Sequence, residues 1–166
     1  MQVPKRKPGI YTNQESDPHL TPAKLDELKR ELHRLKTVSR PQAILETKRL
    51  AEMGDFSENA EYQIAKGRLR GINNRIDELV DQIDRAVVIV PESTADVIAI
   101  GHTVIIEQDG EQKTFQILGS TESNPHLGII SYQSPLGAAL IGKKIGDVFE
   151  VLLGKRNVSC RVIKIT

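Results

Sequence analysis

Two acidic side chains, Asp55 and Glu58, stand three residues apart within residues 54–58, and their types and spacing suggest chemistry. Carboxylate oxygens suit Mg²⁺, which is commonly held by only one or two protein carboxylates while it keeps several waters. The same spacing also fits a capping box, in which an aspartate at the N-cap and a glutamate three residues later satisfy free backbone N–H groups at a helix start. Spacing alone leaves both interpretations open. Two carboxylates alone form a weak metal site, so a second macromolecule would have to supply the other ligands.

Basic side chains gather next to this acidic segment. Residues 63–76 contain no acidic residue and residues 77–84 contain no basic one, so the two charges are separated into blocks. Such separation predicts a surface that meets a phosphate backbone, although a run of like charge is also typical of a plain solvated helix face. The candidate RNA-binding residues of the two facing helices are Lys48, Arg49, Lys66, Arg68, Arg70 and Arg75.

Two long helices are predicted to carry these groups. Thr21-Pro22 marks the start of the first helix, because threonine is a good N-cap and proline is favoured at the first helical position. Its apolar stripe contains Leu25, Leu28, Leu32 and Leu35, continues through Ile44, Leu45 and Leu50, and is expected to kink or weaken at Pro41. The second helix has a heptad seam with the spacing 4-3-4-3-4, formed by Ala65, Leu69, Ile72, Ile76, Leu79 and Ile83.

Helices with matching stripes and a short connection pack antiparallel. We therefore predict a coiled-coil hairpin over residues 21–91 with its tip at 54–58, in which the second helix is roughly 43 Å long at about 1.5 Å per residue. Residues 1–20 hold three prolines and few apolar residues, and are interpreted as a flexible basic leader.

Residues 92–166 change to the period of strands. Strands are predicted at 103–107, 113–118, 128–132, 148–153 and 158–165, with a hairpin turn at Gln108-Asp109-Gly110 and a short helix from Ser134-Pro135 to Ile141. The predicted fold class is therefore α+β, with an N-terminal antiparallel coiled-coil hairpin and a compact β-rich domain behind it.

Composition limits the function classes. The net charge is +1, so a nucleic-acid role must rest on local patches. No apolar run approaches the roughly 20 residues of a membrane span, and the N-terminus lacks the apolar core of a secretory signal. Cys160 is the one cysteine, which favours a reducing cytoplasm, and the four histidines are isolated, which argues against a zinc site.

Two motifs carry a family resemblance. Residues 54–62, with the sequence Gly-Asp-Phe-Ser-Glu-Asn-Ala-Glu-Tyr, resemble the tip signature of the bacterial transcript cleavage factors GreA and GreB. A second signature of this family, in its C-terminal domain, is resembled by Ser134-Pro135-Leu136, Leu140 to Lys144 and Gly146-Asp147. The resemblance covers about residues 21–166. The run from Tyr62 to Ile76 looks more like GreB than GreA. In one departure, Gly137 and Ala138 stand where the family often has an arginine two residues after the position of Leu136.

The resemblance implies a coiled-coil hairpin and a C-terminal domain similar to FK506-binding proteins. That domain would dock on the rim of the secondary channel of bacterial RNA polymerase through Ser134, Pro135 and Leu136. The hairpin would reach the active site, where Asp55 and Glu58 help to hold the second Mg²⁺ and orient the attacking water, so that the polymerase cleaves the 3′ end of its nascent RNA and escapes arrest. The chain would then be a cytoplasmic, monomeric accessory factor and not an enzyme by itself.

Two other functions remain as alternatives. A Gre-like factor can occupy the channel and inhibit the polymerase without promoting cleavage, but such a blocker does not need the pair of Asp55 and Glu58. A metal nuclease acting alone is disfavoured, because no further acids or histidines converge on the tip.

Overall fold

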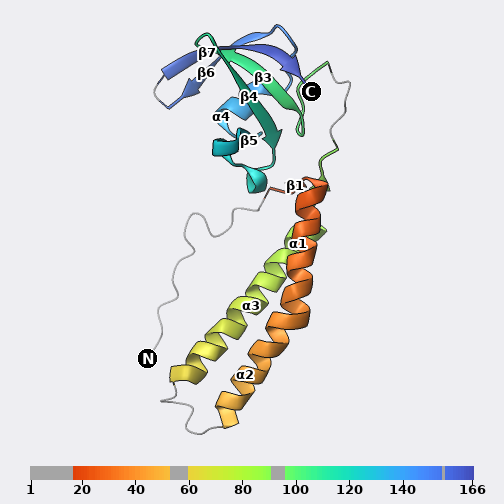
Figure 1. Cartoon of the computed structure of the whole chain (residues 1–166), viewed down its shortest axis with the longest axis vertical. Helices are drawn as coiled ribbons and strands as arrows, with labels where there is room; N and C mark the ends of the chain where they lie inside the picture. The colour runs from red at the N-terminus through yellow and green to blue at the C-terminus, as the bar shows by residue number, and fades with distance from the viewer. Residues whose placement is uncertain (1–16, 53–59, 91–95, 155) are drawn as a thin grey trace, which may run out of the picture.

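The computed structural model describes residues 17–52, 60–90, 96–154 and 156–166. The molecule is elongated, with a helical hairpin at one end and a curled sheet at the other (Figure 1). Among the described helices there is none that combines the length and the apolar character needed to cross a lipid bilayer.

The first arm of the hairpin is one continuous helix built from three stretches, α1 (Pro22–Arg34), η1 (Leu35–Ser39) and α2 (Arg40–Glu52). The predicted start is confirmed, since the Thr21 hydroxyl accepts a hydrogen bond from the Lys24 N–H at 3.2 Å and Pro22 occupies the first helical position. Pro41 lies inside the helix as the second residue of α2, which follows the π-helical turn η1.

The spacing of buried residues explains the π-helical turn. Leu28 and Leu35 are seven residues apart, as are Ala43 and Leu50, but eight residues separate Leu35 from Ala43. A π turn holds one residue more than an α turn, because its hydrogen bonds run from i to i+5. The bond from the Arg40 N–H to the Leu35 carbonyl is of this kind. The turn therefore absorbs the extra residue and returns the apolar positions to the hairpin interior.

The second arm is α3 (Ala60–Asp84), which lies beside the first arm in the opposite direction (Figure 1). Its predicted seam is confirmed, because Ala65, Ile76 and Leu79 are buried. Ile72 and Ile83 pack against the cluster that α1 and α3 share. On the first arm, by contrast, Ile44 and Leu45 are 44% and 67% exposed, so the expectation that they continue the stripe is wrong.

The base of the hairpin is closed by two short parallel strands, β1 (His19–Leu20) and β2 (Val87–Val88). Leu20 is fully buried against the hairpin cluster. Residues 17–20, which the sequence placed in the leader, are thus part of the base of the hairpin.

The β-rich domain is a five-stranded sheet with the order β5-β4-β3-β7-β6. Its strands are β3 (Thr103–Gln108), β4 (Glu111–Leu118), β5 (Ile129–Ser131), β6 (Val148–Leu153) and β7 (Arg156–Ile165), and its helices are η2 (Ser120–Glu122), η3 (Pro125–Leu127) and α4 (Pro135–Leu140). All strand pairs are antiparallel except β4 with β5. The predicted strands, the turn at Asp109-Gly110 and the α+β class are confirmed.

Candidate functional site

The predicted acidic tip, with Asp55 and Glu58, belongs to residues 53–59 and lies outside the described residues. The helix ends on either side of it, α2 at Glu52 and α3 at Ala60, lie at the end of the hairpin that is farthest from the sheet (Figure 1). The described residues contain no group of three or more histidine, cysteine or acidic side chains placed to hold a metal ion.

The predicted basic residues of α3 divide between two flanks of the helix. Lys66 and Arg70 are four residues apart and therefore share one flank. Neither forms an ion pair with a described residue, and the Lys66 ammonium lies 5.9 Å from the centre of the Tyr62 ring. Arg68 and Arg75, seven residues apart, lie on the flank that faces the first arm. Only the first flank therefore presents cations without a described carboxylate partner.

Arg75 has a structural partner. Its guanidinium donates from Nε to Glu31 Oε1 at 3.0 Å and from Nη2 to Glu31 Oε2 at 3.2 Å, and it also lies 3.4 Å from a Glu78 oxygen. The hydrogen bond from Arg75 holds the pKa of Glu31 below its ordinary value, and the same bond raises the pKa of Arg75. This two-point contact joins α3 to α1 and neutralises the arginine charge locally.

Two of the remaining basic candidates, Arg68 and Lys48, also lie near carboxylates. Arg68 Nη1 is 3.5 Å from a Glu46 oxygen across the hairpin, and Lys48 Nζ is 3.9 Å from Glu52. Lys48 and Arg49 are both exposed on α2. These contacts are open to solvent and contribute little stability.

The predicted docking residues form the start of α4. The Ser134 hydroxyl accepts from the Gly137 N–H at 3.1 Å and donates to the Ser131 carbonyl at 2.6 Å, so it caps the helix and fixes it to the end of β5. Pro135 is exposed, whereas Leu136 is only 7% exposed and belongs to the core of the domain. Of the three residues, Leu136 thus holds the helix in place and Pro135 faces solvent.

Two acidic residues that the sequence did not single out join the hairpin to the sheet domain. The buried carboxylate of Asp17 accepts from the Ser120 N–H at 2.7 Å and the His19 N–H at 3.0 Å. Burial opposes ionisation, but these bonds outweigh it and hold the pKa of Asp17 below its ordinary value. Glu122 accepts from both the N–H and the hydroxyl of Thr21, at 2.8 and 2.6 Å. No local pattern identifies such pairs, because their members are about a hundred residues apart.

Comparisons with known proteins place the whole described architecture in one family. Residues 19–88 match the family model of a transcription elongation factor, N-terminal, and residues 92–166 match that of a transcription elongation factor, GreA/GreB, C-term. The transcription elongation factor GreA of Nautilia profundicola is 46% identical over 131 residues, which are 77% of this chain and 81% of that protein. This chain belongs to the GreA/GreB family. GreA of Rhodospirillum rubrum is 44% identical over 135 residues, with 80% and 86% of the two chains covered.

These relatives carry the name GreA, so the GreB-like character expected from residues 62–76 gains no support from them. A solved structure of GreA factor homolog 1 (Gfh1) from Thermus thermophilus is 31% identical and covers 89% of this chain and 97% of its own. The TM-score between the two structures is 0.40.

Gly137 lies between Leu136 and the position where the GreA/GreB family often has an arginine, and close packing explains the glycine. A Cβ at this position would lie 2.1 Å from the Ser131 carbonyl oxygen and 3.0 Å from the Tyr132 Cα. The start of α4 therefore approaches the backbone after β5 more closely than any side chain permits.

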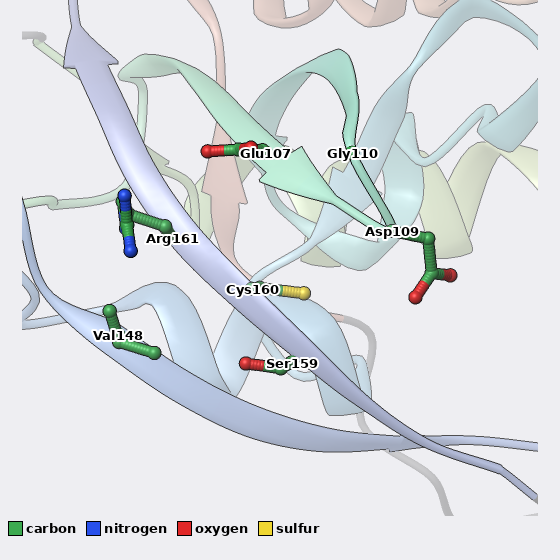
Figure 2. A pocket seen from close by; sticks show the side chains of 7 residues that line it. All are labelled: Glu107, Asp109, Gly110, Val148, Ser159, Cys160 and Arg161. Atoms are coloured by element: carbon green, nitrogen blue, oxygen red, sulfur yellow. The ribbon is translucent and has the colours of Figure 1, made fainter.

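A polar cavity of about 180 Å³ lies among β3, β6 and β7, and none of the predicted site residues lines it (Figure 2). Arg161, Glu107 and Ser159 contribute polar groups, while Cys160 is only 1% exposed. Burial and the nearby charge of Asp109 raise the pKa of the Cys160 thiol. The Cys160 thiol is thus buried and unreactive.

Proposed function

We propose that this chain enters the secondary channel of bacterial RNA polymerase and stimulates the polymerase to cleave the 3′ end of its nascent RNA. The observation that supports this most is that α2 ends at Glu52 and α3 begins at Ala60, both at the end of the hairpin opposite the sheet domain, and that the sequence between them contains Asp55 and Glu58 (Figure 1). At about 1.5 Å per residue, the 25 residues of α3 alone extend roughly 38 Å. A rod of this length suits delivery of side chains into a narrow channel of a partner.

The sheet domain is the part proposed to dock on the rim of the channel. Pro135 and Ala138 are exposed at the start of α4, while Leu136 and Ser134 hold the helix against the sheet. Ala138 stands at the position where an arginine is common in the family, so docking here relies on shape and apolar contact more than on charge.

The tip carboxylates are proposed to act in trans. Carboxylate oxygens are the donors that Mg²⁺ prefers, and two of them leave room for ligands from the polymerase. Such a metal, when bound, supplies a Lewis acid and activates water. Asp55 and Glu58 would hold it from this chain's side and orient the water, while the chain alone has no nuclease activity.

Lys66 and Arg70, which have no carboxylate partner among the described residues, are proposed to contact the extruded RNA. Lys66 and Arg70 share a flank on the half of α3 nearer the tip, and the charge of Arg75 is already balanced by Glu31. Contacts to phosphates release counterions and therefore weaken steeply with salt.

The test compares Asp55→Asn with Asp55→Ala on backtracked elongation complexes that carry labelled RNA. Asparagine caps a helix as well as aspartate does, whereas alanine costs about 0.5–2 kcal/mol. Loss of charge alone should abolish most of the stimulated cleavage, with partial rescue by raised Mg²⁺ or by Mn²⁺, while the variant still competes with the parent for polymerase. Asp77→Asn, an exposed acid far along α3, serves as the matched control and should behave like the parent.

Each alternative gives a distinct result in this assay. A fully active Asp55→Asn with the parental metal dependence would reduce the acidic pair to a helix cap. Inhibition of the polymerase by the parent without any cleavage would identify a channel-blocking factor. Cleavage of free RNA without polymerase would identify a nuclease.

A further inference from the structure

The hairpin and the sheet domain meet at a joint formed by residues 17–21, η2 and the end of β5. Its main contact is the carboxylate of Glu122, which accepts two hydrogen bonds from Thr21, from the backbone N–H at 2.8 Å and from the hydroxyl at 2.6 Å. Thr21 is the N-cap of α1, so the carboxylate binds the first residue of the hairpin's first arm.

This contact replaces a missing part of the helix cap. In a capping box, a glutamate or glutamine at the third helical position reaches back to the N–H of the N-cap residue. Here that position is Lys24, which carries no acceptor, and Glu122 takes its place from 101 residues farther along the chain. The start of α1 is therefore completed by a group that belongs to the other domain.

A second contact prevents the joint from turning about the first. The buried carboxylate of Asp17 accepts from the backbone of Ser120, which is the first residue of η2. The backbones also touch, since a Cβ on Gly119 would lie 2.2 Å from the His19 carbonyl oxygen. Two contacts on the same short segment fix the orientation of the hairpin relative to the sheet domain, whereas a single contact would allow the hairpin to rotate about it.

The joint is also connected to the start of α4. The Ser120 hydroxyl lies 2.9 Å from the Ser131 hydroxyl, and the Ser131 carbonyl accepts from Ser134, the N-cap of α4. One chain of hydrogen bonds thus links the base of the hairpin to the proposed docking helix.

We propose that Glu122 is a positioning residue that, with Asp17, sets the angle of the hairpin on the sheet domain and so the place that the tip reaches when that domain is docked. This rests on the proposed function. The first arm from Pro22 to Glu52 is roughly 46 Å long, so a tilt of about 10° at its base moves its far end by about 8 Å. Misplacement by about 1 Å can cost roughly 100-fold in rate, so the joint must hold its angle closely.

The test measures the angle and the activity separately. Spin labels are attached to cysteines introduced by Gly67→Cys on α3 and Gln112→Cys on β4, both exposed, while the native Cys160 stays buried. A Cβ at position 67 meets no atom within 4 Å. We expect a narrow distribution of label distances in the parent and a clearly broader one in Glu122→Ala. Thr21→Ser retains both donors and should give the parental distribution, and Glu150→Gln, which changes an exposed carboxylate of the same domain, should also leave it unchanged.

In the cleavage assay, Glu122→Ala should lower the maximal stimulated rate by roughly 10- to 100-fold and change the half-saturating factor concentration by less than about twofold. Thr21→Ser should retain the parental rate. Circular dichroism checks that each variant keeps its helix content, and Glu122→Gln, which can still accept from the Thr21 N–H, provides a milder variant of intermediate effect.

An unchanged distance distribution in a folded Glu122→Ala would overturn the proposal, whatever the cleavage activity. A broadened distribution with a parental cleavage rate would overturn the link between the joint angle and the tip. If the parent itself stimulates no cleavage, the proposed function fails, while the distance measurement still decides whether Glu122 sets the angle.

Discussion

Replacing Gly137 by alanine should destabilise the sheet domain and displace the start of α4. The added Cβ would lie 2.1 Å from the Ser131 carbonyl oxygen and 2.9 Å from its carbonyl carbon. Both neighbouring atoms are backbone and have no side-chain torsion with which to move away. We therefore expect α4 to shift by about 1.4 Å, since an ordinary non-bonded contact is about 3.5 Å.

The expected cost has two parts. Forcing a methyl group into a packed site typically costs about 1–3 kcal/mol. The Ser131 carbonyl also accepts hydrogen bonds from the N–H and the hydroxyl of Ser134, at 3.0 and 2.6 Å, and a shift of α4 weakens both. Each bond contributes about 0.5–1.5 kcal/mol. The free energy of unfolding should fall by about 2–4 kcal/mol, and Tm by roughly 4–16 °C at about 2–4 °C per kcal/mol.

Urea unfolding of the full chain, followed by circular dichroism, measures this change. Gly71→Ala is the matched control, because a Cβ on that glycine of α3 meets no atom within 4 Å. In an exposed helix interior, alanine is favoured over glycine by about 0.5–1 kcal/mol, so the control should be stabilised. A Gly137→Ala variant as stable as the parent would refute the close approach of α4 to the Ser131 backbone.

Three further predictions follow from the ion pairs and cations. A double-mutant cycle with Glu31→Gln and Arg75→Met, measured by urea unfolding, should give a coupling free energy of about 0.5–1 kcal/mol. The coupling is small because both side chains are partly exposed and solvent screens the pair. Zero coupling would show that the contact does not stabilise the hairpin. Lys66→Glu combined with Arg70→Glu should weaken activity on backtracked complexes and reduce its salt dependence, and unchanged crosslinking to the RNA 3′ end would leave both residues as a solvated face. The folded pKa of Asp17 lies below the ordinary value of 3.8, so its contribution to stability should be complete above that value and lost as the pH falls through the lower folded pKa. Unfolding measured between about pH 6 and pH 3 should therefore show a smaller loss in Asp17→Asn than in the parent.

The elements that local patterns encode could be predicted from the sequence. The heptad seam of α3, the Thr21-Pro22 helix start and the turn at Asp109-Gly110 each combine a periodicity with a residue suited to one backbone geometry, and all three are present. The acidic pair at 55 and 58 was predicted in the same way and stays a prediction, because it lies outside the described residues.

The remaining features depend on contacts between distant parts of the chain. The burial of Leu20 comes from a two-residue strand whose partner is near residue 87, and the cap that Glu122 gives to Thr21 spans 101 residues. Along the first arm, Ile44 and Leu45 were selected because they are apolar, whereas the π turn changes the phase of the helix and brings Ala43 to the interior. The basic residues were identified from their residue type, but the sequence alone did not show that Arg75 forms an ion pair with Glu31.

The π turn at Leu35–Ser39 also affects how the length of this helix can change during evolution. Deleting one residue between 36 and 39, together with Pro41→Ala, would convert the turn to an α turn and leave Ala43 and Leu50 in their present phase. At any other point along the arm, a single deletion would rotate everything beyond it by about 100° and expose the apolar seam to water. Single-residue deletions in alignments of the first arm should therefore be placed at this turn, where the chain can lose a residue while the apolar seam beyond it keeps its phase.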